Sequence, residues 1–215
     1  SSLMVIIGAV GSYNIYQKLL HQYRNMNSET AVALEGIYSV EEILADDFPL
    51  FTRLKNSSPK LYKHSLLISE ISGQAAKALG ANELLAKAGG MYHEIGRLEG
   101  KQYVDEGVKL AEEYHLPTVV VDIIKQHNLK YDKPKTPEAA IVMMSVSFIA
   151  TKDYLEKNKK SEMKDDNAMI STDKIVDNLF QLRLSKGSLN ESGLTINQFS
   201  LLKDFYLHMQ NDQYK

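Results

Sequence analysis

The sequence predicts an all-α protein. Apolar residues recur at spacings of three and four along most of the chain, which is the period of an amphipathic helix. Helix-start signals such as Ser58-Pro59 precede several of these stretches, and no alternating run between turn residues predicts a strand. The chain has 215 residues, of which 44% are hydrophobic and 24% charged. That length and composition are typical of one globular domain with a substantial core.

Residues 1–57 are expected to form an N-terminal helical extension ahead of the main bundle, which we place at residues 58–215. Residues 3–10 are the most apolar stretch, and their apolar side chains cover every face of a helix rather than one stripe. This run is shorter than the roughly 20 residues that a membrane-spanning helix needs. We interpret it as the end of a membrane anchor, with packing on the core as the alternative. A second helix is expected at residues 13–26.

Cap residues set the boundaries of the helices expected next along the chain. Ser39 and Glu42 match the capping-box pattern of a short helix. Ser58-Pro59 combines a serine cap with proline at the first helical position, and Gly80 ends that helix. The pair Gly89-Gly90 weakens the following helix by about 1 kcal/mol per glycine, so close approach of a neighbouring helix or a ligand must offset this cost. These helices are expected at residues 39–44, 50–55, 58–79 and 81–95.

The second half of the chain is also expected to be helical. Residues 118–127 are rich in β-branched side chains, which also suit a strand. Pro117 fits the first turn of a helix, however, and the neighbouring segments are helical, so a helix is expected. Thr136 and Thr195 are the expected caps of two later helices, and the charged residues 157–167 are expected to form a mobile surface loop. The helices of this half are expected at residues 101–114, 118–127, 137–154, 171–186 and 195–210.

Charge and cysteine content exclude several functional classes. Lys and Arg total 25 against 27 for Asp and Glu, so the formal net charge is -2 and the basic excess typical of DNA- or RNA-binding proteins is absent. The chain has no cysteine, which excludes disulfides, a thiol nucleophile and a thiolate zinc site. Any metal chemistry must therefore use carboxylates and the histidines. The sequence contains six of them, at His21, His64, His93, His115, His127 and His208.

Three of these histidines are expected to point toward the core from separate helices. His64 lies on the helix face of Ile68, and His127 ends an apolar helix face. His93 lies at the end of a third helix, directly before Glu94. Imidazole together with carboxylate suits zinc, iron or manganese.

Four short segments occur in a defined order, KHS at 63–65, YHEIGR at 92–97, KQHN at 125–128 and PEAAIVMM at 137–144. Together they resemble the HD superfamily of metal-dependent phosphohydrolases. In particular they resemble the HDIG-type cytoplasmic domain of seven-transmembrane HD receptors, which includes cyclic di-AMP phosphodiesterases. The resemblance extends over roughly residues 35–207. It implies a single HD-domain helical bundle, a nucleotide or cyclic dinucleotide as ligand, and a cytoplasmic location at the inner face of the membrane behind a preceding membrane segment. A homodimer is compatible with it.

The same resemblance implies roles for individual residues. His64, His93, Glu94 and His127 match the metal ligands of the family, and Glu94 would also serve in catalysis. Arg97 stands where the family has a lysine and would pair with the substrate phosphate. The implied cofactor is one divalent transition metal ion, either iron, manganese or zinc, or none if the site is degenerate.

Several family positions carry other residues in this chain. His93-Glu94 replaces a His-Asp pair, Asn128 replaces the second histidine of a His-His pair, and the closing aspartate ligand falls at Val146. Residues 100–114 lack the further histidine of family members that bind two metal ions. We therefore expect a reduced one-metal site with weak metal affinity and slow turnover. The alternative is a catalytically inactive HD-fold module that binds a ligand or a protein partner in signalling.

Each candidate residue also has a purely structural interpretation. A single inward histidine is more often a hydrogen-bonded core residue than a metal ligand, and Glu94 is spaced to pair with Arg97 across one helical turn. Three histidines at the motif positions favour a working or vestigial metal site over chance packing. His21, His115 and His208 are assigned to surface or packing roles.

Overall fold

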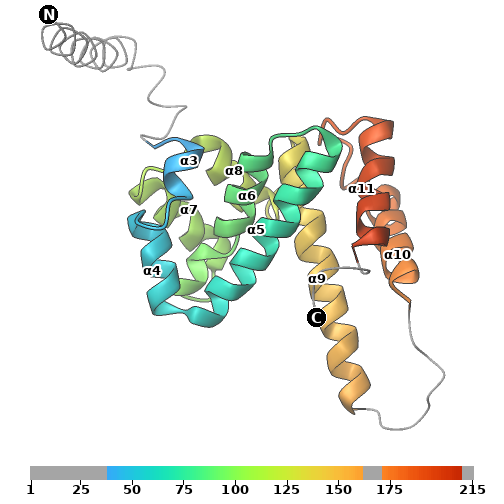
Figure 1. Cartoon of the computed structure of the whole chain (residues 1–215), viewed down its shortest axis with the longest axis horizontal. Helices are drawn as coiled ribbons and strands as arrows, with labels where there is room; N and C mark the ends of the chain where they lie inside the picture. Colours follow the sequence, from blue (N-terminus) through green and yellow to red (C-terminus); the bar gives the residue numbers. More distant parts are fainter. Residues whose placement is uncertain (1–37, 162–170, 210–215) are drawn as a thin grey trace, which may run out of the picture.

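The computed structural model describes residues 38–161 and 171–209 of the chain. Every regular element in these two ranges is a helix (Figure 1), which confirms the all-α prediction. In chain order the elements are α3 (Val40–Ile43), α4 (Pro49–Ser57), α5 (Pro59–Leu79), α6 (Glu83–Tyr92), the 3-10 helix η1 (Ile95–Leu98), α7 (Tyr103–Glu113), α8 (Thr118–Gln126), α9 (Pro137–Ser161), α10 (Thr172–Ser185) and α11 (Ile196–His208).

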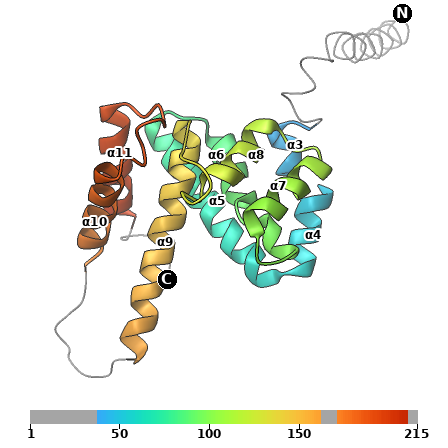
Figure 2. The same cartoon turned by 180° about the vertical axis from the view of Figure 1, so that it is seen from behind.

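Two large apolar clusters form the core, and α5 contributes to both. The first cluster joins the start of α5 to α3, α4, α6, η1, α7 and α8, and its largest buried side chain is Tyr92. The second joins the rest of α5 to α9, α10 and α11 around Phe148 and Tyr206. Figures 1 and 2 accordingly show α3, α4, α7 and α8 on one side of the molecule, and α10 with α11 on the other.

Most helix boundaries follow the predicted caps. Ser39 and Glu42 form the capping box of α3, with both reciprocal hydrogen bonds present. Gly80 ends α5 at a φ of 68°, a left-handed conformation that favours glycine. Thr195 caps α11 together with Gln198. Short-range cap chemistry therefore accounts for where these helices begin and end.

Two helix starts differ in detail from the prediction. Ser58 precedes α5 as expected, but its side chain makes no capping hydrogen bond. The helix expected from residue 81 begins at Glu83 instead, because Asn82 acts as its cap. The Asn82 side chain accepts a hydrogen bond of 3.0 Å from the backbone N–H of Leu85.

The loop predicted at residues 157–167 is wrong for its first part, since α9 continues to Ser161. Lysine is a good helix former, so a lysine-rich stretch that follows a long helix extends it rather than ending it. The remainder of that predicted loop, residues 162–167, lies outside the described residues.

The N-terminal predictions are only partly covered by the structure. The apolar run at residues 3–10 and the helix expected at residues 13–26 lie outside the described residues. The described helices α3 and α4 pack in the same apolar cluster as α6 and α8. The division of the chain at residue 58 stays a prediction. Among the helices of the described ranges, none has the length and apolar character that crossing a bilayer requires.

Glycines let α6 pack directly against the backbone of α5. A Cβ atom on Gly90 would lie 2.6 Å from the Cα of Ser69, which is too close for any side chain. On the next residue, a Cβ on Gly89 would lie 2.7 Å from the Cγ2 of Ile123 in α8. The predicted close approach of neighbouring helices to this glycine pair is therefore confirmed. It holds α5 and α8 against the end of α6, where His93 and Glu94 follow.

Candidate metal centre

His93 and Glu94 leave α6 at its C-terminal end. The helix ends at Tyr92, His93 is its C-cap residue, and Glu94 departs from helical geometry with φ of -115° and ψ of 20°. The His93 side chain is completely buried, whereas Glu94 keeps 13% of its side chain exposed. The two adjacent side chains therefore lie over a helix end, as a shared metal site would require.

His64 reaches the same place from α5. Its Nε2 lies 3.9 Å from Oε2 of Glu94, and its ring centroid lies 5.4 Å from that of His93. Together the three residues offer ligand atoms that all lie within 4.8 Å of one another. Among the residues that the structure describes, this is the group of histidine and carboxylate side chains whose ligand atoms come close enough together to share one metal ion. The structure thus brings together three of the four predicted ligands as one cluster.

His127 joins this cluster from the C-terminal end of α8. Its ring packs edge-on against His93, with centroids 5.2 Å apart and an interplanar angle of 86°. It stands outside the tight group of three, but only 5% of the residue is exposed and its ring packs against that of His93. The fourth predicted ligand is therefore a neighbour of the other three.

The hydrogen bonds of the two buried histidines fix which ring nitrogen carries the proton. Nδ1 of His93 lies 2.7 Å from the carbonyl oxygen of Gly90, and Nδ1 of His127 lies 2.7 Å from that of Ile124. A carbonyl oxygen can only accept, so each Nδ1 must carry the proton and donate it. Each Nε2 is then an unprotonated acceptor, and both are buried with no hydrogen-bond partner. Such a lone pair is what a metal ion takes from histidine.

Burial also keeps these two rings neutral. Desolvation, with the nearby His127, lowers the pKa of His93 to about 3. Desolvation likewise lowers the pKa of His127 to about 4. Neutral imidazole is the form that binds metals, so both rings are in the ligating form at neutral pH.

Glu94 supplies negative charge to the cluster. Burial by itself raises the pKa of its carboxyl, but the hydrogen bond and the charge of Arg97, together with the adjacent rings of His93 and His64, outweigh this, and the net pKa falls below the usual value. The Arg97 Nη2 donates to Oε1 of Glu94 at 2.6 Å. The ion pair between Glu94 and Arg97, which was the structural interpretation of Glu94, is therefore present. It uses Oε1 and leaves Oε2 of Glu94 facing His64.

Tyr103, the first residue of α7, is a site residue that no sequence pattern marks. Arg97 lies over its ring with Cζ 4.2 Å from the ring centroid, and the ring also lies 5.9 Å from that of His127. Asn128, at the position of the missing second histidine, donates from Nδ2 to the Tyr103 hydroxyl at 2.9 Å. The one feature of the sequence that pointed to this contact was Asn128, which replaces a histidine of the family pattern.

The remaining candidate positions add no ligand to this cluster. Val146 is half-buried and packs among apolar side chains, so its place supplies no ligand. His115 and His208 are exposed, and Nδ1 of His208 bonds to the carbonyl oxygen of Asp204 within α11. His21 lies outside the described residues.

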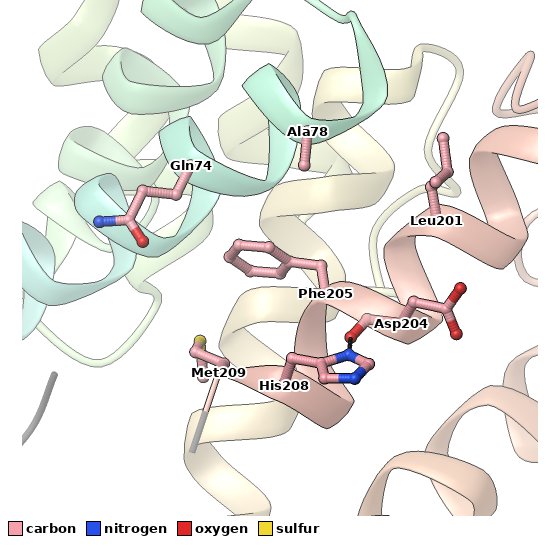
Figure 3. Close-up of a pocket in the computed structure, with 7 residues that line it drawn as sticks. All are labelled: Gln74, Ala78, Leu201, Asp204, Phe205, His208 and Met209. Carbon is pink, nitrogen blue, oxygen red and sulfur yellow. Dashed lines mark hydrogen bonds between the residues drawn. The ribbon is translucent and has the colours of Figure 1, made fainter. Parts of the chain in front are cut away.

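A mostly apolar hollow lies between α5 and α11, away from these residues. Figure 3 shows the ring of Phe205 extending from α11 toward α5 inside it. The hollow has a volume of about 390 Å³ and is lined by Gln74, Ala78, Leu201, Asp204, Phe205, His208 and Met209. None of the candidate metal ligands lines it, so the hollow and the histidine cluster are separate features.

Comparison with known proteins bears directly on the cluster. Residues 61–145, which contain all four candidate ligands, match the family model of the HD domain. This segment is therefore similar to the HD domain. The match confirms the resemblance drawn from the four ordered segments, and the helical architecture confirms the expected HD-type bundle.

Curated relatives of the HD domain include enzymes of two kinds. The cyclic-di-AMP phosphodiesterase PgpH of Listeria monocytogenes is 24% identical over 86% of this chain and 32% of its own length. PgpH of Bacillus subtilis is 23% identical over 81% of this chain and 30% of its own length. Ribonuclease Y of Aster yellows witches'-broom phytoplasma is 33% identical over 41% of this chain and 17% of its own length. The chain thus spans about a third of the length of the PgpH proteins.

Solved structures show the same fold. The HD domain of L. monocytogenes PgpH in complex with cyclic-di-AMP superimposes with a TM-score of 0.65 at 22% identity. The match covers 78% of this chain and 99% of that domain. At this identity the likeness establishes the HD fold for our chain.

Proposed function

We propose that this HD domain binds one divalent metal ion and hydrolyses a phosphodiester bond of a cyclic dinucleotide. The observation that carries the proposal is the pair of buried, unpartnered Nε2 atoms of His93 and His127 beside the carboxylate of Glu94. Polar atoms left in this state cost stability, so they favour an occupant that accepts their lone pairs.

The donor set fits a metal ion of the expected kind. His64, His93, His127 and Glu94 supply three imidazoles and one carboxylate, which suits zinc, iron or manganese. The carbonyl oxygens of Gly90 and Ile124 hold the two buried rings in the ligating tautomer. When bound, a divalent metal ion would polarise a phosphoryl oxygen and acidify water.

The protein residues have separate tasks in this proposal. Arg97 pairs with a phosphate oxygen, since 47% of its side chain is exposed next to the cluster. Glu94 is the proposed catalytic residue, with Oε1 held by Arg97 and Oε2 facing His64, where it would also be available to hold a metal ion. The buried rings of His93 and His127 exclude water from the inner side of the site.

The choice of a cyclic dinucleotide rests on the relatives. PgpH proteins are named for hydrolysis of cyclic-di-AMP, and a PgpH HD domain has been crystallised with that nucleotide. The match covers nearly all of that domain, so the same substrate class is the first to test here. A cytoplasmic location at the inner membrane face, a preceding membrane segment and a homodimer stay predictions from the same resemblance.

A second candidate is ligand binding without hydrolysis. It is favoured by the apolar side chain of Val146 at the place of a carboxylate, and by the single carboxylate of the cluster being tied to Arg97. Fewer anionic ligands mean weaker metal binding and less help for a reacting water.

One experiment separates the two candidates. The full chain is incubated with manganese and cyclic-di-AMP, and the linear product is measured by chromatography alongside calorimetric binding. Slow product formation that is lost with EDTA and in Glu94→Gln supports hydrolysis. Binding without product supports the inactive module, and the absence of both binding and product contradicts the choice of substrate.

A further inference from the structure

Tyr103 contacts two residues of the candidate site from one position. The Arg97 guanidinium lies over its ring at 4.2 Å, in cation–π contact. The same ring lies 5.9 Å from the ring of His127, at 44° to it. The Tyr103 hydroxyl accepts a hydrogen bond of 2.9 Å from Nδ2 of Asn128. Tyr103 therefore links the cation to His127, in addition to the direct contact of Arg97 with Glu94.

The backbones behind these side chains are fixed relative to one another. Gly96 directly precedes Arg97, and a Cβ atom on Gly96 would overlap the carbonyl oxygen of Tyr103 and the backbone nitrogen of Gly107. Hence η1 and the start of α7 pack backbone against backbone. Asn128 directly follows His127, so the residue that anchors Tyr103 is held by the same turn as a candidate ligand.

The guanidinium of Arg97 is held on two sides and open on others. Glu94 binds one of its nitrogens at 2.6 Å, the Tyr103 ring covers one face, and 47% of the side chain remains exposed. Arginine carries five N–H donors, so donors remain for an incoming anion. A cation held in this way has already lost the rotamer freedom that binding would otherwise cost.

We propose that Tyr103, anchored by Asn128, is the positioning residue that holds the Arg97 guanidinium beside the histidine cluster for pairing with a substrate phosphate. The substrate part of this inference rests on the proposed function, whereas the positioning of Arg97 does not. Tyr103 acts through Arg97 and does not itself contact the reacting phosphate.

The Nε–H signal of Arg97 in heteronuclear NMR spectra of the full chain tests the positioning directly. The signal is assigned by its loss in Arg97→Lys. In the wild type it should be shifted by the aromatic ring, and in Tyr103→Leu it should move to the region of exposed arginines. Asn128→Ala should produce a partial shift in the same direction, because the ring loses its anchor. An unchanged Arg97 signal in Tyr103→Leu overturns the proposal.

Tyr154→Leu is the matched control for that experiment. Tyr154 lies on α9 with 65% of its surface exposed, so its loss removes a tyrosine that has no part in the site. The Arg97 signal should stay in place in this variant. A shift equal to that of Tyr103→Leu would mean that the signal does not report the Tyr103 contact, and would also overturn the proposal.

Calorimetric binding of cyclic-di-AMP to manganese-loaded protein tests the consequence. Tyr103→Leu should weaken binding about five-fold, the size of one cation–π contact, with unchanged metal content. In an Arg97→Ala background the same change should add nothing, because Tyr103 acts through Arg97. A further loss in that background overturns the proposal. If the wild type binds no cyclic-di-AMP, the proposed substrate fails, and the NMR experiment alone decides whether Tyr103 positions Arg97.

Discussion

At the level of single residues, two buried nitrogen atoms lower the stability of the metal-free fold. Nε2 of His93 and Nε2 of His127 are both buried without a partner. An unsatisfied buried polar atom costs roughly 1–3 kcal/mol. A bound metal ion would satisfy both atoms, so metal should stabilise the folded state through them.

Replacing His127 by Leu should therefore abolish stabilisation by metal. Leucine removes the unpartnered nitrogen while filling a similar buried space. With metal at about a hundred times its Kd, the wild type should gain about 2.7 kcal/mol of unfolding free energy, and the variant should gain nothing measurable. Urea unfolding with manganese or with EDTA gives both values. An equal gain in the two proteins would show that His127 holds no metal.

Val146→Asp tests whether the altered site can be repaired. The residue packs against the cluster around Ile123, which lies one helical turn before His127 in α8. A carboxylate there should raise metal affinity because it adds an anionic ligand and offsets the charge of the ion. Metal titration by calorimetry measures the change. Unaltered affinity would place residue 146 beyond reach of the metal.

The four candidate ligands could be predicted from the sequence, and Tyr103 could not. Helical spacing put His64 on an inward face, and motif order identified His93 and His127. The contact between Tyr103 and Arg97 depends on how η1 meets α7, which no local spacing encodes.

At the level of elements, the pairing of α5 with α6 depends on Gly90. In Gly90→Ala the new Cβ would meet the Ser69 backbone at 2.6 Å, so the helices must separate. We expect a loss of about 1–3 kcal/mol in unfolding free energy. Metal affinity should fall as well, because His64 on α5 would move away from His93. Urea unfolding and metal titration measure the two effects.

Gly73→Ala is the matched control on α5. The atoms nearest its new Cβ belong to the side chain of Lys87, 2.5 Å away at Cγ, and not to backbone, so a change of the lysine rotamer relieves the contact. Alanine also favours helix over glycine by up to about 1 kcal/mol. This variant should therefore keep its stability and its metal affinity. If Gly90→Ala behaved in the same way, close packing of α5 on α6 would not be what places the histidines.

Element boundaries were predictable where a side chain caps a helix. Ser39, Gly80 and Thr195 mark such ends, and each acts within one turn of the chain. The extension of α9 to Ser161 was not predictable in this way, because no cap or glycine marks its end and a charged sequence suits both helix and loop.

At the level of the whole molecule, α6 and α8, which lead into His93 and His127, contribute to the first apolar cluster, whereas α10 and α11 pack in the second. Tyr206 of α11 is fully buried in the second one, where its hydroxyl lies 2.8 Å from Oγ of Ser145 and 3.4 Å from the carbonyl oxygen of Ile141. Tyr206→Phe should lower unfolding free energy by about 1 kcal/mol and leave metal affinity unchanged. Urea unfolding and metal titration check this. A large change in metal affinity would mean that the two sides act as one unit.

The fold class followed from helical period and caps, whereas the way the helices share two clusters did not. That arrangement depends on contacts far apart in sequence, such as Gly90 on Ser69 and Tyr206 on Ser145. The order of motifs added what periodicity could not give, since it pointed to the HD domain, whose family model matches residues 61–145.

Metal content tests the central claim most directly. The full chain is purified without a metal-affinity tag and without added metal, and is analysed for bound elements before and after incubation with excess iron or manganese. We expect about one bound ion per chain, absent in His93→Ala. No bound ion under either condition would contradict a metal site in this chain.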